Sequence, residues 1–329
     1  MGVGLGLTGW LGIGKESTYG TPVARTNFFE INDESLAVEE GRIESAALAK
    51  VGIRNTKVAK GAIGVAGDFS FDATYAGWER LLDYLLGGHT SIQPDVTSNP
   101  SVWDHVYSIS DSLPTSMTME VFRGSENFVT NPNYSFIYEG CQITSGTFNC
   151  GADDLLKCGF SVIGEDENKG AMSTPVYTDS KLAVYHQGLV KWNNDDVEVS
   201  NFSITINNAL EGRPKLGSRK TRQPKRSGKL EVTGSFQAEF VGWDEYNDFR
   251  NATERAFAAD FTDDSAVISG SYYSKISFAA AIAKITNHRV VLNTPGRLIM
   301  EVAFKAYRTN SAGEITITLR NNTTASLAN

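Results

Sequence analysis

A short phrase occurs twice in this chain. Residues 71–78 read Phe-Asp-Ala-Thr-Tyr-Ala-Gly-Trp and residues 236–243 read Phe-Gln-Ala-Glu-Phe-Val-Gly-Trp, an offset of 165 in a chain of 329 residues. The agreement continues beyond the tryptophan, where three positions correspond: Glu79 with Asp244, Asp83 with Asp248, and Tyr84 with Phe249. A repeat of nearly half the chain predicts two copies of one folding unit.

Each phrase predicts the end of a strand followed by a short helix. In both copies apolar residues alternate with polar ones as far as Tyr75 and Phe240, which is typical of a strand with one buried face. After the glycine the spacing becomes helical, and this stripe predicts helix–sheet packing by Trp78, Leu81, Leu82 and Leu85 in the first copy and by Trp243, Tyr246 and Phe249 in the second. Gly87 and Gly88 are expected to end the first helix.

Further segments support the repeat. Residues 138–164 and 278–307 each predict two strands about a turn, with Ile143-Thr144 corresponding to Ile285-Thr286 at an offset of 142. The first copy therefore holds about 23 extra residues, close to the length of a polar segment at 89–112 that we interpret as a surface loop with some strand. Five segments follow: an N-terminal arm at 1–27, a first unit at 28–165, a linker at 166–183, a second unit at 184–308, and a C-terminal arm or extra strand at 309–329.

Composition favours a soluble globular protein. Apolar residues make up 41% and charged residues 21% of the chain, and no run approaches the roughly 18 apolar residues of a membrane span. The first residues lack the positive segment of a signal peptide, so we expect assembly in the cytoplasm. The three cysteines, Cys141, Cys150 and Cys158, contain no C-x-x-C pair and are expected as buried thiols on strands.

No catalytic motif emerges. Residues 9–15 have the glycine spacing of a phosphate-binding loop, but Glu16 stands where that loop needs a hydroxyl, and no strand is expected before it. The four histidines, His89, His105, His186 and His288, have no metal-ligand spacing. We therefore expect no enzyme activity, no metal and no cofactor.

Residues 212–229 form a strongly basic segment. They hold eight of the 30 lysines and arginines and no acid, which leaves 22 basic against 38 acidic residues elsewhere, a net charge of −16. Three interpretations follow: contact with nucleic-acid phosphates, docking on an acidic patch of another copy of the chain, or a solvated loop. The segment contains no aromatic residue to stack on bases, so we favour self-association.

The N-terminal residues resemble a known family. Residues 12–22, Gly-Ile-Gly-Lys-Glu-Ser-Thr-Tyr-Gly-Thr-Pro, look like a segment common in major tail tube proteins of long, non-contractile-tailed bacteriophages, and Asn207-Asn208-Ala-Leu-Glu-Gly is similarly suggestive. The order of strands, long loop, Gly-Trp helix and strand pair resembles that family's tube domain, twice. The resemblance implies a mainly β fold of two tandem β-sandwich domains, each with one flanking helix.

The resemblance also implies an assembly. In that family, rings of six domains stack into a tube that carries DNA, so two domains per chain imply a trimeric ring with pseudo-sixfold symmetry. Residues 41–64 and 212–229 become inter-ring loops, with candidate contacts at Lys50, Arg54, Lys57, Lys60, Arg213, Lys215, Arg219, Lys220, Arg222, Lys225, Arg226 and Lys229.

The implied partners are further copies of this chain, tape measure, terminator and distal tail proteins, and DNA as a transient passenger, in the virion tail and without a membrane. Two alternatives remain at this stage. One is a nucleic-acid-binding protein that uses residues 212–229. The other is a tail ring that does not repeat, such as a terminator or baseplate component.

Overall fold

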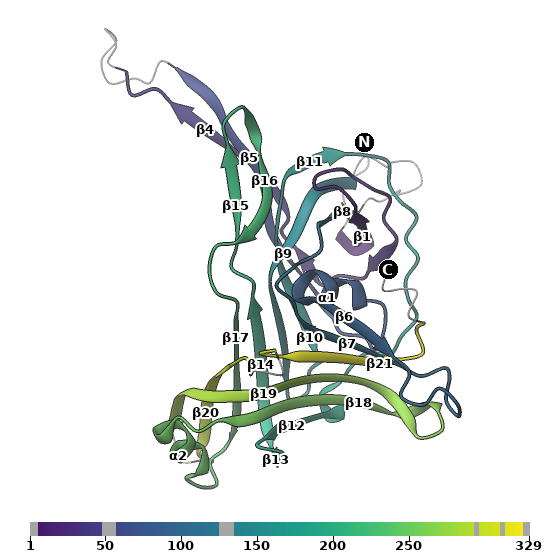
Figure 1. Cartoon of the computed structure of the whole chain (residues 1–329), viewed down its shortest axis with the longest axis vertical. Helices are drawn as coiled ribbons and strands as arrows, with labels where there is room; N and C mark the ends of the chain where they lie inside the picture. Colours follow the sequence, from purple (N-terminus) through teal and green to yellow (C-terminus); the bar gives the residue numbers. More distant parts are fainter. Residues whose placement is uncertain (1–5, 48–56, 125–134, 293–295, 310–312, 325–329) are drawn as a thin grey trace.

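The computed structural model describes residues 6–47, 57–124, 135–292, 296–309 and 313–324, and shows a mainly β chain with two short α-helices in this part (Figure 1). The expected mainly β class with short helices is confirmed. The strands join into one large mixed sheet, because β9 (Ser135–Gly151) pairs with β14 (Val199–Asn207) across the middle of the chain.

The remaining elements up to the middle of the chain are as follows: β1 (Trp10–Glu16), β2 (Asn27–Phe29), β3 (Asp33–Glu34), β4 (Ala37–Glu44), β5 (Val58–Asp72), α1 (Glu79–Leu86), β6 (Gly87–Ile92), β7 (Trp103–Ile109), β8 (Ser116–Phe122), β10 (Lys157–Gly164) and β11 (Asp166–Lys169). Those that follow are β12 (Gly188–Trp192), β13 (Asp195–Val197), β15 (Leu210–Lys215), β16 (Ser218–Arg226), β17 (Glu231–Glu239), α2 (Asp244–Asn251), β18 (Arg255–Ser269), β19 (Tyr272–Val291), β20 (Ile299–Ala306) and β21 (Thr316–Asn321).

The core follows from alternation along the strands. In β10, every second residue from Cys158 to Gly164 is buried, so one face of the strand lies in the core. The rings of Phe69, Phe71 and Phe160 stack on this face, with centroids 5.4 to 6.4 Å apart. The cysteines are free and buried on β9 and β10, as expected.

The N-terminal segment differs from the expected arm. Residues 10–16 form strand β1, which pairs with β2 on one side and β8 on the other, and Leu11 and Ile13 are fully buried. The buried Glu16 accepts hydrogen bonds from Ser116, Thr118 and the amide of Gly140. The glycine-rich residues therefore form an interior strand, because glycines let neighbouring backbone approach closely.

The C-terminal strand and the extra segment of the first half meet. The expected strand with alternating Ile315, Ile317 and Leu319 is confirmed as β21, which pairs with β19 on one side and β7 on the other. Strands β6 and β7 form a hairpin over residues 87–109, which overlaps the segment 89–112 interpreted as a surface loop with some strand. The Arg320 guanidinium joins the Asp104 carboxylate at 2.6 and 2.8 Å, which fixes β21 beside β7.

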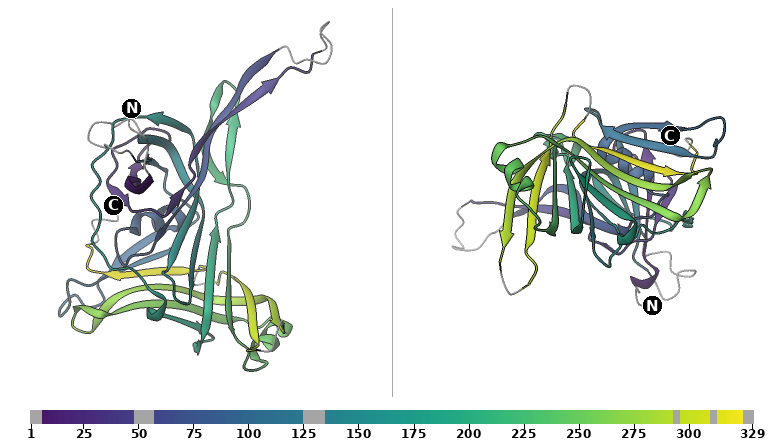
Figure 2. Two further views of the ribbon diagram at one scale, coloured as in Figure 1. Left: turned by 180° about the vertical axis from the view of Figure 1, so that it is seen from behind. Right: turned by 90° about the horizontal axis from the view of Figure 1, so that it is seen from below.

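Two hairpins project from the same end of the molecule (Figures 1 and 2). One is formed by β4 and β5, and the other by β15 and β16. The second contains most of the basic segment, which was expected as a loop and instead forms paired strands. No helix in the described part of the chain is long and apolar enough to cross a membrane.

Candidate assembly surfaces

The two halves have the same strand order. In the first, β3 and β4 pair with β5, then β10, then β9. In the second, β14 pairs with β17, then β20, then β19. A second set of strands shares β9 and β19: the order β2–β1–β8–β9–β11 in one half corresponds to β13–β12–β18–β19–β21 in the other.

The long strands β9 and β19 carry a bulge at the same place. Thr144 is the extra residue in β9 and Thr286 in β19, at the expected offset of 142. Each threonine hydroxyl donates to a carbonyl on the neighbouring strand, Thr144 to Ser161 at 3.1 Å and Thr286 to Ala303 at 3.2 Å. Bulges re-aim strands, so both halves turn their long strand at an equivalent position.

The repeated phrase aligns differently in the sheet than in the sequence. The Ala73 amide donates to the Leu156 carbonyl at 2.7 Å, and the Phe240 amide donates to Leu298 at 3.0 Å. This correspondence sets an offset of 167 for the strands, whereas both helices begin directly after their tryptophan at an offset of 165. Phe71 therefore corresponds to Ala238 in the sheet, not to Phe236, because the second half has two fewer residues between strand and helix.

The two tryptophans occupy different environments. Trp78 is 1% exposed, its Nε1 donates to the Thr74 carbonyl, and its ring lies 6.1 Å from that of Phe148. Leu81, Leu82 and Leu85 of α1 are fully buried. Trp243 was expected to pack helix against sheet, but it is 64% exposed, and its ring lies 5.5 Å from the rings of Phe240 and Tyr246. Phe249 is partly buried against the core.

The halves join along β9 and β14. Their seven paired residues run antiparallel, from Ser145 opposite Asn207 to Gly151 opposite Asn201. The Phe148 ring packs 5.0 Å from that of Phe278, and the Asn208 amide donates to the Leu85 carbonyl at 2.7 Å. Among the described residues, the matching edges at the two ends of this order, β3 with β4 and residues 287–291 of β19, pair on one side only.

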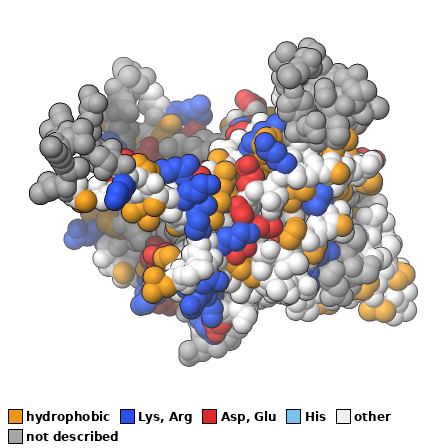
Figure 3. Space-filling view, turned by 90° about the horizontal axis from the view of Figure 1, so that it is seen from above, with side chains coloured by type: hydrophobic (Ala, Val, Ile, Leu, Met, Phe, Trp, Pro, Cys, Tyr) orange, Lys and Arg blue, Asp and Glu red, His pale blue; other side chains and the backbone are white. Residues whose placement is uncertain are grey.

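The basic hairpin is anchored to acidic residues of its own chain. The Lys220 ammonium lies 2.7 Å from Glu139, 3.0 Å from Asp166 and 3.8 Å from Glu165. Partial burial opposes the charged form, but hydrogen bonds to Glu139 and Asp166 raise the pKa of Lys220 above its usual value. Figure 3 shows basic side chains beside a group of acidic ones at this end of the molecule.

A second anchor lies at the base of the other hairpin. Arg219 donates to the Glu40 carboxylate and to the Gly61 carbonyl. Hydrogen bonds from Arg219 and then Arg42 lower the pKa of Glu40 to about 2. The two hairpins are thus held side by side, and β16 meets β5 where Lys220 pairs with Ile63. Sequence reasoning missed these anchors, since no local pattern connects residues 40 and 219.

The other predicted contact residues lie at different depths. Lys57, Lys60, Lys215, Arg222, Lys225 and Lys229 are exposed. Arg213 donates to the Gln223 carbonyl, and Arg226 donates to Ser110 and Asn208, so these two guanidinium groups are held within the chain. Burial lowers the pKa of Arg226. Lys50 and Arg54 lie outside the described residues.

Two histidines that the sequence left unconnected lie together. The Ser91 hydroxyl is 3.0 Å from His89 Nε2 and 2.8 Å from His105 Nδ1, and His89 Nδ1 is 3.6 Å from the Asp83 carboxyl. Burial raises the pKa of Asp83 to about 7 and lowers that of His89, so both groups tend toward their neutral forms. The cluster fastens the β6–β7 hairpin beneath α1.

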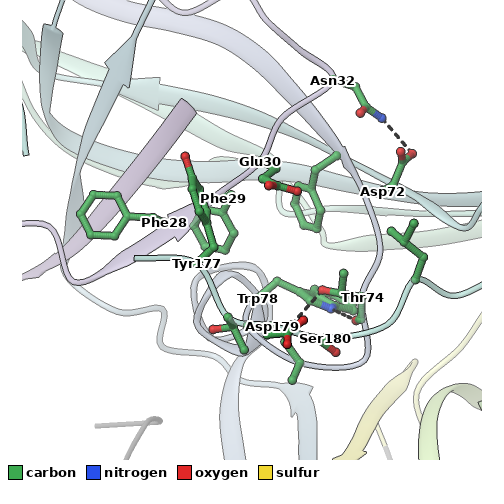
Figure 4. Close-up of a pocket in the computed structure, with 15 residues that line it drawn as sticks. Phe28, Phe29, Glu30, Asn32, Asp72, Thr74, Trp78, Tyr177, Asp179 and Ser180 are labelled. Carbon is green, nitrogen blue, oxygen red and sulfur yellow. Dashed lines mark hydrogen bonds between the residues drawn. The ribbon is translucent and has the colours of Figure 1, made fainter. Parts of the chain in front are cut away.

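A pocket of about 510 Å³ lies between β2, the end of β5 and residues 177–182 (Figure 4). Its described lining includes aromatic residues and three carboxylates, from Glu30, Asp72 and Asp179, but no lysine or arginine. Asn32 donates to Asp72 at 2.9 Å within it. Within the part of the chain that the structure describes, no group of three or more histidines, cysteines or carboxylates could hold a metal ion.

These features define a structural protein with open strand edges and projecting hairpins. A family model described as phage tail tube protein matches residues 6–319, and the chain belongs to that family. The family is structural and non-enzymatic, and membership implies self-assembly in the virion tail. A search of curated proteins found no match.

Proposed function

We propose that this chain is a duplicated tube subunit of a long, non-contractile phage tail. Three copies close into a ring with pseudo-sixfold symmetry, rings stack, and DNA passes through the lumen. The observation that carries the proposal is the pairing of β9 with β14 inside one chain. The counterpart of β9 is β19 and the counterpart of β14 is β3 with β4, and the corresponding edges of these strands are unpaired among the described residues. A contact that repeats head to tail and closes gives a ring.

The tandem organisation is supported by the bulges and by the strand order. Thr144 and Thr286 occupy the same position relative to their neighbours, and α1 and α2 each follow a strand that ends against β10 or β20. We therefore propose two sandwich-like units, at 28–165 and 184–308. Residues 10–16 belong with the first unit because β1 lies between β2 and β8.

The projecting hairpins are proposed as the stacking contacts. Both lie at one end of the molecule, where a neighbouring ring would meet them (Figure 2). Arg219 and Lys220 act as internal anchors in this scheme. The exposed Lys215, Arg222 and Lys225 are proposed to meet acidic side chains of the next ring, since the rest of the chain carries a large negative excess. Such a body also repels DNA from the wall of the lumen.

The alternative of a nucleic-acid-binding protein is less well supported. Two of the basic residues that it requires, Arg219 and Lys220, are neutralised by carboxylates of the same chain. A tail ring that does not repeat remains an alternative, and it predicts single rings where a tube protein predicts filaments.

Electron microscopy of the purified chain tests the proposal. We expect hollow filaments whose rotational averages show six similar lobes with exact threefold symmetry. Single rings that never stack would favour the terminator or baseplate alternative. Monomers at every protein concentration and ionic strength would contradict a tube-forming role.

A paired charge reversal tests the stacking contact. Arg222→Glu with Lys225→Glu is expected to leave rings intact and to shorten filaments, because these side chains lie on the projecting hairpin and are exposed. Filament length is measured by electron microscopy. The control is Lys191→Glu on β12, at the opposite end of the molecule (Figure 1). Equal shortening by both variants would contradict the assignment.

A further inference from the structure

We infer that the apolar surface around Trp243, which directly precedes α2, together with the open edge of β19, receives the β3–β4 edge of a second copy of this chain in a defined register. The inference rests on the proposed function and deepens it, because it names the residues of the lateral contact. It follows from treating the β9–β14 junction as an internal copy of that contact.

The register between two copies is obtained by replacing each residue of β9 by its counterpart in β19, and each residue of β14 by its counterpart in β3 or β4. The bulges relate β9 to β19 by 142 residues. Strands β5 and β17 correspond at an offset of 167, so Phe69 corresponds to Phe236. Glu34 lies opposite Phe69, and Phe202 lies opposite Phe236. Glu34 therefore corresponds to Phe202, and β3 and β4 correspond to β14 at an offset of 168 residues.

The contact within the chain then predicts the contact between chains. Thr147 lies opposite Thr205, and their hydroxyls are 3.2 Å apart. Their counterparts are Arg289 and Ala37, which are therefore opposite each other between copies. The same shift places Val290 opposite Leu36 and His288 opposite Val38.

Exposure supports this assignment. Several residues of the first half and of the internal junction are covered, whereas their counterparts at the chain's outer edges are open; Leu36, the counterpart of Ile204, is already buried within the chain. Four buried residues have exposed counterparts. Phe148 is 0% exposed and its counterpart Val290 is 37% exposed, and Cys150 is 7% exposed and its counterpart Leu292 is 77% exposed. Likewise, Ile206 is 0% exposed against 37% for Val38, and Trp78 is 1% exposed against 64% for Trp243. Each of the four open side chains is apolar, and each is more exposed than its buried counterpart. A second copy would cover all four at once.

Charge also fits the register. On the face opposite the apolar residues, Arg289 lies across from Ala37 and diagonal to Glu39, and both charged side chains are exposed. Diagonal neighbours across antiparallel strands lie about 7–8 Å apart at Cα, within reach of long side chains. The paired backbone edges further satisfy amides and carbonyls that are otherwise left to solvent.

Disulfide cross-linking tests the register in the full chain. The double variant Ala37→Cys with Arg289→Cys is expected to form covalent multimers on oxidation, because directly opposed Cβ atoms lie about 4.5–5.5 Å apart. The control is Val38→Cys with Arg289→Cys, whose side chains point to opposite faces. The native cysteines are buried, so each single variant serves as a baseline.

Three results are informative. Multimers from Ala37→Cys with Arg289→Cys, and none from the control, support the inference. Filaments in which that pair fails to cross-link, or in which the control cross-links equally well, overturn the register and leave the proposed tube function intact. Absence of any assembly by the unmodified chain overturns both.

Truncation of Trp243 tests the apolar surface independently. Trp243→Ala is expected to weaken lateral association by about 30-fold or more, as for a central interface tryptophan, without changing the thermal unfolding of the single chain. Val96→Ala is the matched control, because Val96 is also 64% exposed but lies between β6 and β7. Lateral association is measured by sedimentation. Unchanged association of Trp243→Ala, or loss of stacking alone, overturns the assignment.

Discussion

The two repeated tryptophans differ in burial although they occupy the same place in the repeated phrase. Trp78 and Trp243 close the same phrase and precede helices of equal length. The second half has two residues fewer between strand and helix, and its tryptophan ring is exposed. The spacing of apolar residues predicted both helices. It could not predict this difference in burial, because the burial of a side chain depends on the residues that pack on it from elsewhere in the fold.

We expect Trp78→Ala to destabilise the single chain by about 3–5 kcal/mol, since it removes a large buried ring and leaves a cavity. Trp243→Ala should change the free energy of unfolding by less than about 0.5 kcal/mol, as for most exposed positions. Urea denaturation of the unassembled chain measures both. Equal losses would show that the two sites are packed alike in solution.

The buried carboxyl of Asp83 provides a test of pH dependence. Its pKa is raised from 3.8 to about 7 by burial, so the protonated form favours folding. This contribution is present below about pH 4 and is lost as the pH rises through 7. Asp83→Asn should therefore be more stable than the native chain at pH 8, by up to about 4 kcal/mol, with the difference shrinking toward pH 4.

The measurement is urea denaturation of the unassembled chain at pH 5 and pH 8. His89 contributes in the opposite direction, because burial lowers its pKa and its stabilising effect is lost as the pH falls. The control is Asp195→Asn at an exposed position, which should leave the free energy of unfolding unchanged at both pH 5 and pH 8. A difference for Asp83→Asn that is independent of pH would contradict the assignment.

At the scale of elements, the basic hairpin is held by Lys220. Its ammonium neutralises Glu139, whose side chain is only 5% exposed. Lys220→Ala leaves that carboxylate without its cation, so we expect faster hydrogen exchange of backbone amides in β15 and β16. Lys225→Ala, which changes an exposed residue of the same strand, is the control. Unchanged exchange in the Lys220 variant would show that backbone pairing alone holds the hairpin.

Elements were predictable where the pattern was local. The alternation of Ile315, Ile317 and Leu319, the correspondence of Thr144 with Thr286, and the starts of both helices were predicted from spacing alone, whereas the bulges at the two threonines were not. The buried strand at residues 10–16 was missed because its glycines hide the alternation. The basic segment was expected as a loop, since strongly basic composition masks strand pairing and its anchors, Glu40 and Glu139, lie far away in sequence.

At the scale of the whole molecule, two kinds of contact are expected to respond differently to salt. The stacking contact proposed for the hairpins depends on exposed charges, which 1 M salt screens beyond about 3 Å. The lateral contact that we infer would depend on backbone pairing and apolar cover, which salt does not weaken. Filaments in 1 M sodium chloride should therefore separate into rings of three chains before the rings open. Sedimentation measures this, and single chains appearing first would contradict it.

The pairing of β7 with β21 has a mechanical consequence. Within each chain, this pair and the Arg320–Asp104 link add a second seam between the halves, beside the β9–β14 junction. The second half has no equivalent of the β6–β7 hairpin among its described residues, so the proposed contact between neighbouring chains would lack that seam. Around a ring, stiff joints would alternate with more compliant ones. Under tension the circle should yield at three places, each between separate polypeptides.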